Sequence, residues 1–83
     1  MSDCLEIKRE VRLTIKLPER IEKSLLASYL KNSLKEDMIV ISSSIFDNIV
    51  SVACFSSSDT NKVNLAIENF CQENHLQIKE KPD

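Results

Sequence analysis

Side chains that commonly perform acid–base or nucleophilic chemistry are few in this sequence. His75 is the single histidine, and its place near the end of a predicted helix indicates a solvent-exposed residue. Glu36 and Asp37 are adjacent carboxylates, but no convergent polar groups accompany them, so we interpret them as a polar turn. The chain has no glycine, which phosphate-binding loops and nucleophile elbows require. We therefore expect a non-catalytic protein that uses no cofactor.

Three cysteines are present, at Cys4, Cys54 and Cys71. Their odd number and the absence of a CxxC spacing argue against a disulfide framework or a zinc site, and a single histidine adds no ligand set. We interpret them as reduced thiols that pack as small apolar side chains. A Cys–Cys pair of the kind found in hyperthermophiles remains the alternative.

Two serine clusters, at residues 42–44 and 56–58, invite a phosphorylation or ligand-binding interpretation. Serine hydroxyls also bond to nearby backbone groups at strand ends and helix starts, and we favour that interpretation. For the second cluster this predicts a helix beginning near Asp59.

Basic side chains recur along the first part of the chain, at Lys8, Arg12 and Lys16. They would share the wet face of a strand and could contact RNA phosphates. Glu6 and Glu10 are interleaved with them, and a mixture of signs is typical of a solvated surface. The formal net charge of −2 also differs from that of most autonomous nucleic-acid binders.

These residues must be positioned by elements that the hydrophobic pattern predicts. Apolar residues alternate over 5–17, which indicates one long strand ended by Pro18. Apolar residues at three- and four-residue steps predict an amphipathic helix over 19–34. A β-branched run over 38–41 predicts a strand that continues toward Ile45. With the apolar run over 49–55, it predicts a hairpin around the Asp47–Asn48 turn.

The last part of the chain predicts a second helix over 59–74, followed by a charged, frayed tail over 79–83. The element order is therefore β-α-β-β-α in a single domain that spans residues 1–83. We expect an α+β fold with a three-stranded, mainly antiparallel sheet and two helices on one face. No apolar run reaches the roughly 20 residues of a membrane helix, and the N-terminus is not a signal peptide, so we expect a cytoplasmic protein.

A chain of 83 residues buries a small core, and oligomerisation is one way to stabilise such a domain. The predicted helices carry more apolar surface than three strands can cover, which indicates either a wrapped core or a partner-binding face. We favour the partner-binding face and assign it to Leu26, Tyr29, Leu30, Leu65 and Phe70. For pairing through the sheet we assign the strands that contain Ile39, Ile41, Val50 and Val52.

Three stretches carry a resemblance to a known family: residues 13–18 (LTIKLP), 48–52 (NIVSV) and 58–67 (SDTNKVNLAI). With the order of elements, they resemble the CTAG/Pcc family, the small dimerising subunits of the KEOPS (EKC) complex, over residues 7–74. In the last helix Asp59 matches the acidic position of the family signature and Val63 its leucine. Asn64 stands where arginine is usual and Glu68 where asparagine is usual, which fits a divergent archaeal paralogue.

The resemblance implies a function and a set of partners. KEOPS makes the threonylcarbamoyl-adenosine modification of tRNA, and its catalysis belongs to a separate Kae/TsaD-type subunit. A Pcc-type subunit pairs through its sheet, and its helices pack against the catalytic subunit. We therefore expect a heterodimer with a Pcc-type subunit, or a homodimer, with tRNA contacted only indirectly and no membrane partner.

Two other hypotheses belong to different classes. The first is a small RNA-binding module that uses the Lys8, Arg12 and Lys16 face, although it lacks the strand aromatics and the glycine loop of common RNA-binding folds. The second is a stand-alone enzyme or ligand binder, which the missing glycines and the single histidine disfavour. Salt-dependent tRNA binding would favour the first, and a deep polar pocket the second.

Overall fold

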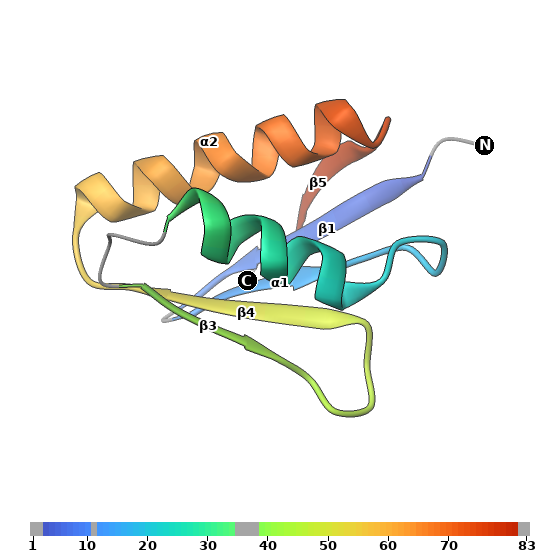
Figure 1. Cartoon of the computed structure of the whole chain (residues 1–83), viewed down its shortest axis with the longest axis horizontal. Helices are drawn as coiled ribbons and strands as arrows, with labels where there is room; N and C mark the ends of the chain where they lie inside the picture. The colour runs from blue at the N-terminus through green and yellow to red at the C-terminus, as the bar shows by residue number, and fades with distance from the viewer. Residues whose placement is uncertain (1–2, 11, 35–38, 82–83) are drawn as a thin grey trace.

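The structure is a computed structural model that describes residues 3–10, 12–34 and 39–81. The predicted Glu36–Asp37 turn lies outside these residues. Figure 1 shows the elements in chain order, which are β1 (Cys4–Arg9), β2 (Leu13–Lys16), α1 (Lys23–Ser33), β3 (Ile39–Ser43), β4 (Ile49–Cys54), α2 (Ser57–Glu73) and β5 (Gln77–Lys81).

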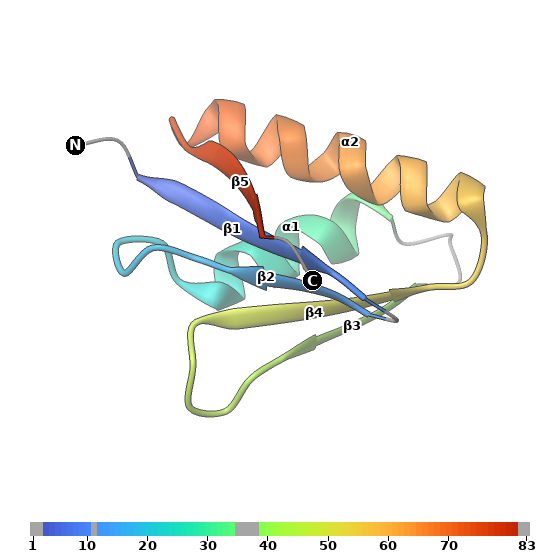
Figure 2. The same cartoon turned by 180° about the vertical axis from the view of Figure 1, so that it is seen from behind.

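The strands form one five-stranded sheet in the order β3-β4-β2-β1-β5. Three neighbouring pairs are antiparallel, and β5 runs parallel to β1. Figures 1 and 2 show both helices on the same side of the sheet, which leaves its other face open. The predicted α+β class is confirmed. The predicted three-stranded sheet and the β-α-β-β-α order are wrong, because two strands were missed.

The first missed strand arises because the predicted long strand over 5–17 is a hairpin. β1 and β2 pair antiparallel, with Ile7 opposite Ile15 and Arg9 opposite Leu13. Odd-numbered residues therefore face the helices on both strands, and after the turn the alternation resumes in the same phase as before it. The break in the pattern at Arg9, followed by charged Glu10, is the sequence signal for this turn.

The second missed strand, β5, follows α2 through a left-handed turn. His75 has a φ of 56°, and the Leu76 N–H donates to the Cys71 carbonyl at 2.8 Å. This hydrogen bond is typical of a Schellman C-cap, where glycine is usual and histidine is tolerated. The turn sends residues 77–81 along β1, so the predicted frayed tail is wrong for residues 79–81; residues 82–83 lie outside the described part.

The two helices begin differently from each other. α2 starts as predicted from the serine cluster, because the Ser56 hydroxyl accepts a hydrogen bond from the Asp59 N–H at 3.1 Å. α1 begins at Lys23 rather than at residue 19, and no side chain caps it. Before it, the Ile21 N–H donates to the Pro18 carbonyl at 3.0 Å, which makes a separate turn.

One core fills the space between the sheet and the helices. Phe70 of α2 lies at its centre and makes an edge-to-face contact with Tyr29 at a centroid distance of 5.4 Å. The sheet contributes buried side chains from its three inner strands, and the helices contribute theirs from one stripe each. The largest fully buried side chains are Phe70, Leu5, Ile7, Ile15, Leu26, Leu30, Ile67, Val50, Val52 and Val63.

Among the described residues, neither α1 nor α2 combines the length and the apolar character that a bilayer-spanning helix needs.

Candidate functional site

The strand β3 lies at one edge of the sheet and pairs only with β4 among the described residues. Its sequence, Ile39-Val40-Ile41-Ser42-Ser43, carries no charged side chain. Ile39 and Ile41 face the helices and pack against the core, whereas Val40 faces outward and is 55% exposed. An uncharged strand at a free edge offers backbone N–H and C=O groups to another strand. This edge is therefore able to extend the sheet.

A groove of about 580 Å³ lies beside this edge on the open face of the sheet. Residues of β3 and β4 form its floor, and Phe55, which is 70% exposed, stands directly after β4. The register brings Val40 opposite Ala53 and Ser42 opposite Ser51, so small or apolar side chains adjoin one another here. The lining residues are Arg12, Val40, Ser42, Ser51, Ala53, Cys54 and Phe55.

The loop between β3 and β4 exposes two large apolar side chains. Ile45 is 85% exposed and Phe46 is 92% exposed. The loop is nevertheless fastened to the fold, because the Lys23 ammonium donates to the carbonyls of Ser44, Ile45 (3.4 Å) and Asp47 (3.2 Å). Burial in the core does not explain the position of these two side chains.

Asn48 fastens the same loop from its other end. Its side-chain amide donates to the carbonyls of Pro18 at 3.0 Å and Ile21 at 2.7 Å. The Leu17 N–H in turn donates to the Asn48 carbonyl at 3.0 Å. These bonds join the β3–β4 loop to the segment between β2 and α1, so the predicted Asp47–Asn48 turn is confirmed and is held by tertiary contacts.

The other half of the open face is charged. It holds Lys8, Lys16 and the two lysines of β5, as the strand register shows. Lys8 lies opposite Thr14 on β2 and Lys81 on β5. Glu6 lies opposite Lys16 on β2 and Lys79 on β5. The Lys8 ammonium lies 2.9 Å from the Glu10 carboxylate, and that of Lys81 lies 3.2 Å from Glu6. Of the three predicted RNA-contacting residues, Lys8 and Lys16 therefore lie on this charged half. Arg12 lines the groove near β3.

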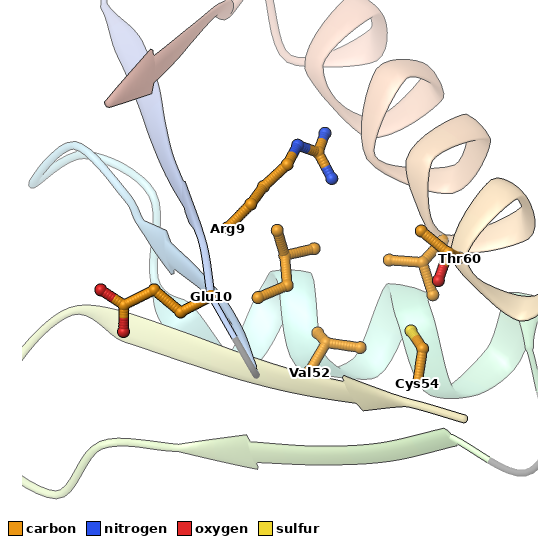
Figure 3. A pocket seen from close by; sticks show the side chains of 7 residues that line it. Arg9, Glu10, Val52, Cys54 and Thr60 are labelled. Carbon is orange, nitrogen blue, oxygen red and sulfur yellow. The ribbon is translucent and has the colours of Figure 1, made fainter. Parts of the chain in front are cut away.

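A smaller cavity of about 280 Å³ opens on the helix side of the sheet, between the β1–β2 turn and the first turns of α2 (Figure 3). Arg9 extends toward α2 along one wall, and Cys54 and Thr60 come from the other side. The guanidinium of Arg9 lies 2.7 Å from the Glu80 carboxylate, which engages it in an ion pair. The cavity thus combines the paired cation of Arg9 with the polar residues Glu10 and Thr60 and the apolar residues Leu13, Val52 and Val63.

The thiols next to this cavity and in the core favour their protonated form. Desolvation raises the pKa of the Cys54 thiol, a hydrogen bond with Thr60 lowers it, and the nearby Asp59 carboxylate raises it further. Burial raises the pKa of the Cys71 thiol to about 11. Neutral thiols are weak nucleophiles. None of the three cysteines forms a disulfide, and the described residues include no cluster of three or more His, Cys, Asp or Glu side chains suited to a metal ion.

The predicted partner-binding face on the helices is wrong for most of its residues. Leu26, Leu30 and Phe70 are at most 1% exposed and belong to the core. Tyr29 is partly buried against the same core, and only Leu65, at 60%, is an exposed side chain. Five strands cover a wider arc of each helix than three would, so the surplus of apolar surface inferred for the helices is used internally.

The predicted sheet-pairing residues divide between two strands. Val50 and Val52 lie on β4, which pairs with β2 on one side and β3 on the other, so they cannot serve as a pairing edge and that prediction is wrong. Ile39 and Ile41 lie on the edge strand β3, and their role in pairing stays a prediction.

The sequence interpretation missed the side chains that the structure exposes at this edge. The sequence pattern predicts Ile45 at the end of a strand and Phe46 at the start of a turn. The signal that could have found them is their position beside Asp47 and Asn48, since two large apolar residues at a hairpin tip cannot reach the core. Val40 and Phe55 carry a similar signal, because they occupy the outward phase of their strands.

Comparison of the chain with known proteins finds no matching family model, no similar curated protein and no similar solved structure.

Proposed function

We propose that the chain is a non-catalytic subunit that pairs with a second small α+β chain through the free edge of β3. The observation that carries this proposal is the uncharged edge strand with exposed apolar side chains beside it, Val40 on the strand and Phe55 next to it. Open edges of this kind pair readily with another strand. A domain of 83 residues also gains stability from such a partner.

The resemblance to Pcc-type subunits supports a specific setting for this pairing. In that setting the chain is a cytoplasmic subunit of a KEOPS-type complex that supports tRNA modification, with a Pcc-type subunit beside it and a Kae/TsaD-type subunit performing catalysis. Strand β5 lies outside residues 7–74, over which the resemblance extends, so this strand adds to the expected family pattern. Leu65 and Leu25, which is 50% exposed, are the apolar side chains left for a helical partner contact.

The test is to mix the purified chain with a Pcc-type subunit at micromolar concentration and to measure the mass in solution by light scattering. We expect a complex that is lost when a lysine replaces Val40 on β3. The matched control is Gln77→Lys, which places the same charge on the opposite edge strand. If the chain forms no complex with a Pcc-type subunit and none with itself, the proposed function is wrong.

A second candidate function is RNA binding through the charged half of the open face. The observation that favours it is β5, which adds Lys79 and Lys81 to the face that already holds Lys8 and Lys16. Glu6 and Glu10 offset part of this charge through their ion pairs. Such a face would contact phosphates without reading base sequence.

Salt-dependent binding of unmodified tRNA to the isolated chain tests this candidate. Binding that weakens steeply with salt, and weakens further in a Lys79→Gln/Lys81→Gln variant, would support it. Lys31→Gln/Lys62→Gln, on the helices, is the matched control for lost charge. Binding that ignores salt, or that both variants reduce equally, would contradict a site on the sheet.

A further inference from the structure

The free edge and the exposed loop define a contact more specific than strand pairing alone. Resting on the proposed function, we propose that the partner is a second copy of this chain, joined β3 to β3 in antiparallel orientation. In this arrangement the β3–β4 loop of each copy docks into the open-face groove of the other. Ile45 and Phe46 are the inserted side chains, and Val40 and Phe55 belong to the groove that receives them.

The loop has the properties of a preformed insert. Three backbone carbonyls accept from Lys23, and the Asn48 amide fixes the end of the loop, so its shape does not depend on a partner. Figures 1 and 2 both show it extending past β3 on the free side of the sheet. A loop whose backbone is already held in place loses less conformational entropy on binding than a mobile loop does.

Antiparallel pairing of two identical edges brings the loop and the groove together. β3 begins at Ile39 beside the groove and ends at Ser43 beside the loop, so a two-fold axis near Ile41 places the end of one strand beside the start of the other. Neighbouring strands lie about 4.8 Å apart, so the groove over β3 and β4 of one copy is within reach of the loop of the other. The contact then forms twice in each dimer.

Size and charge match across this contact. The groove of about 580 Å³ lies within the range of roughly 300 to 1,000 Å³ typical of pockets that hold small-molecule ligands, which leaves room for two side chains. Arg12 lines the groove and Asp47 follows Phe46 in the loop, and both side chains are exposed. Their opposite charges would meet when the loop enters the groove of the other copy. This match, with an apolar insert beside it, favours a second copy over an unrelated partner.

The experiment measures the dissociation constant of the dimer by sedimentation equilibrium, starting from the 9.5 kDa chain. Phe46→Ser is expected to raise this constant at least about tenfold, as loss of a central aromatic anchor does. Asp47→Lys and Arg12→Glu are each expected to weaken the dimer. The double variant Arg12→Glu/Asp47→Lys is expected to restore it, because the two charges are exchanged across the contact.

Ile78→Ser is the matched control, since Ile78 is an exposed apolar side chain on β5, at the opposite edge of the sheet from β3. It is expected to leave the dimer unchanged, and circular dichroism verifies that every variant is folded. The inference is wrong if the chain is monomeric at all concentrations, even if another molecule binds the loop. It is also wrong if neither Phe46→Ser nor the charge exchange changes the dissociation constant of the dimer. In both cases a β3-dependent complex with a Pcc-type subunit would leave the proposed function standing.

Discussion

The two edges of the sheet differ in charge. β5 reads Gln77-Ile78-Lys79-Glu80-Lys81, is exposed along its length, and is tied to β1 by the Arg9–Glu80 and Lys81–Glu6 ion pairs. β3 has no charged side chain and is followed by two exposed apolar residues. Charged side chains, lysine above all, protect an edge strand from unwanted pairing. The difference supports the proposal that β3 is the pairing edge, because the charges of β5 oppose pairing there.

Both edges depend on the same core, and the largest expected effect comes from removing its central aromatic residue. Phe70→Ala deletes a ring that is 1% exposed, and such a truncation destabilises a protein by about 3–5 kcal/mol. Phe46→Ala deletes a ring that is 92% exposed, and we expect the stability of the monomer to change by less than about 0.5 kcal/mol. Urea unfolding followed by circular dichroism, at a concentration too low for association, measures both.

This pair of variants distinguishes apolar residues that stabilise the fold from those that we propose contact a partner. If Phe46→Ala destabilised the monomer as much as Phe70→Ala, the loop would be part of the core. The assignment of the β3 side to a partner would then be wrong.

A charge placed on each edge tests the contrast directly. Val40→Lys puts a lysine on the uncharged edge, and we expect the dissociation constant of any β3-mediated complex to rise about 100-fold, because a charge is costly to desolvate in an interface. Gln77→Lys adds the same charge to β5, which is already charged, and is expected to change the constant less than about twofold. Light scattering over a concentration series gives both values. Equal effects at the two edges would refute the contrast.

The core next to β5 also contains a buried thiol, that of Cys71. Cys71 is 3% exposed, and burial raises its pKa to about 11 from an ordinary value of 9.0. The folded state therefore keeps its proton after the unfolded state has lost it, so stability is intact below about pH 9 and falls as the pH approaches 11. At about pH 10 the expected loss is about 1.4 kcal/mol, which corresponds to one pKa unit.

Comparison with Cys71→Ala isolates this effect, because other titrating groups remain in both proteins. Urea midpoints are measured from about pH 8 to about pH 11, and the wild type is expected to lose stability more steeply than the variant. Parallel curves for the two proteins would mean that the thiol is accessible and that this side of the core is open.

The sequence was sufficient for those elements whose signals are local. The Ser56 cap places the start of α2 within two residues of the prediction, and the Asp47–Asn48 turn correctly joins two antiparallel strands. The hairpin of β1 and β2 was hidden, because pairing Ile7 with Ile15 preserves the alternation of a continuous strand. β5 was hidden because its left-handed turn is made by His75 rather than glycine.

The errors in the candidate site follow from those missed strands. With three strands, the apolar stripes that contain Leu26, Leu30 and Phe70 appeared too wide for the sheet, so they were assigned to a partner. With five strands they are buried. The surplus of apolar surface lies instead at Ile45 and Phe46, where only the tertiary arrangement reveals that the hairpin tip projects beyond the edge.

The smallest expected effect concerns the Arg9–Glu80 ion pair, which should close the β5 edge without contributing much stability. Its side chains are 43% and 59% exposed, and exposed pairs contribute about 0.2–1 kcal/mol. Glu80→Gln is therefore expected to lower the free energy of unfolding by no more than about that amount, and the loss should diminish at high salt because exposed charges are screened. Glu19→Gln, which removes an exposed carboxylate outside the sheet, is the control for lost charge.

Because Lys79 and Lys81 remain on the strand, the Glu80→Gln variant should associate through β5 no more than the wild type does. New association through β5 would mean that the single pair, rather than the charge of the whole strand, keeps this edge closed.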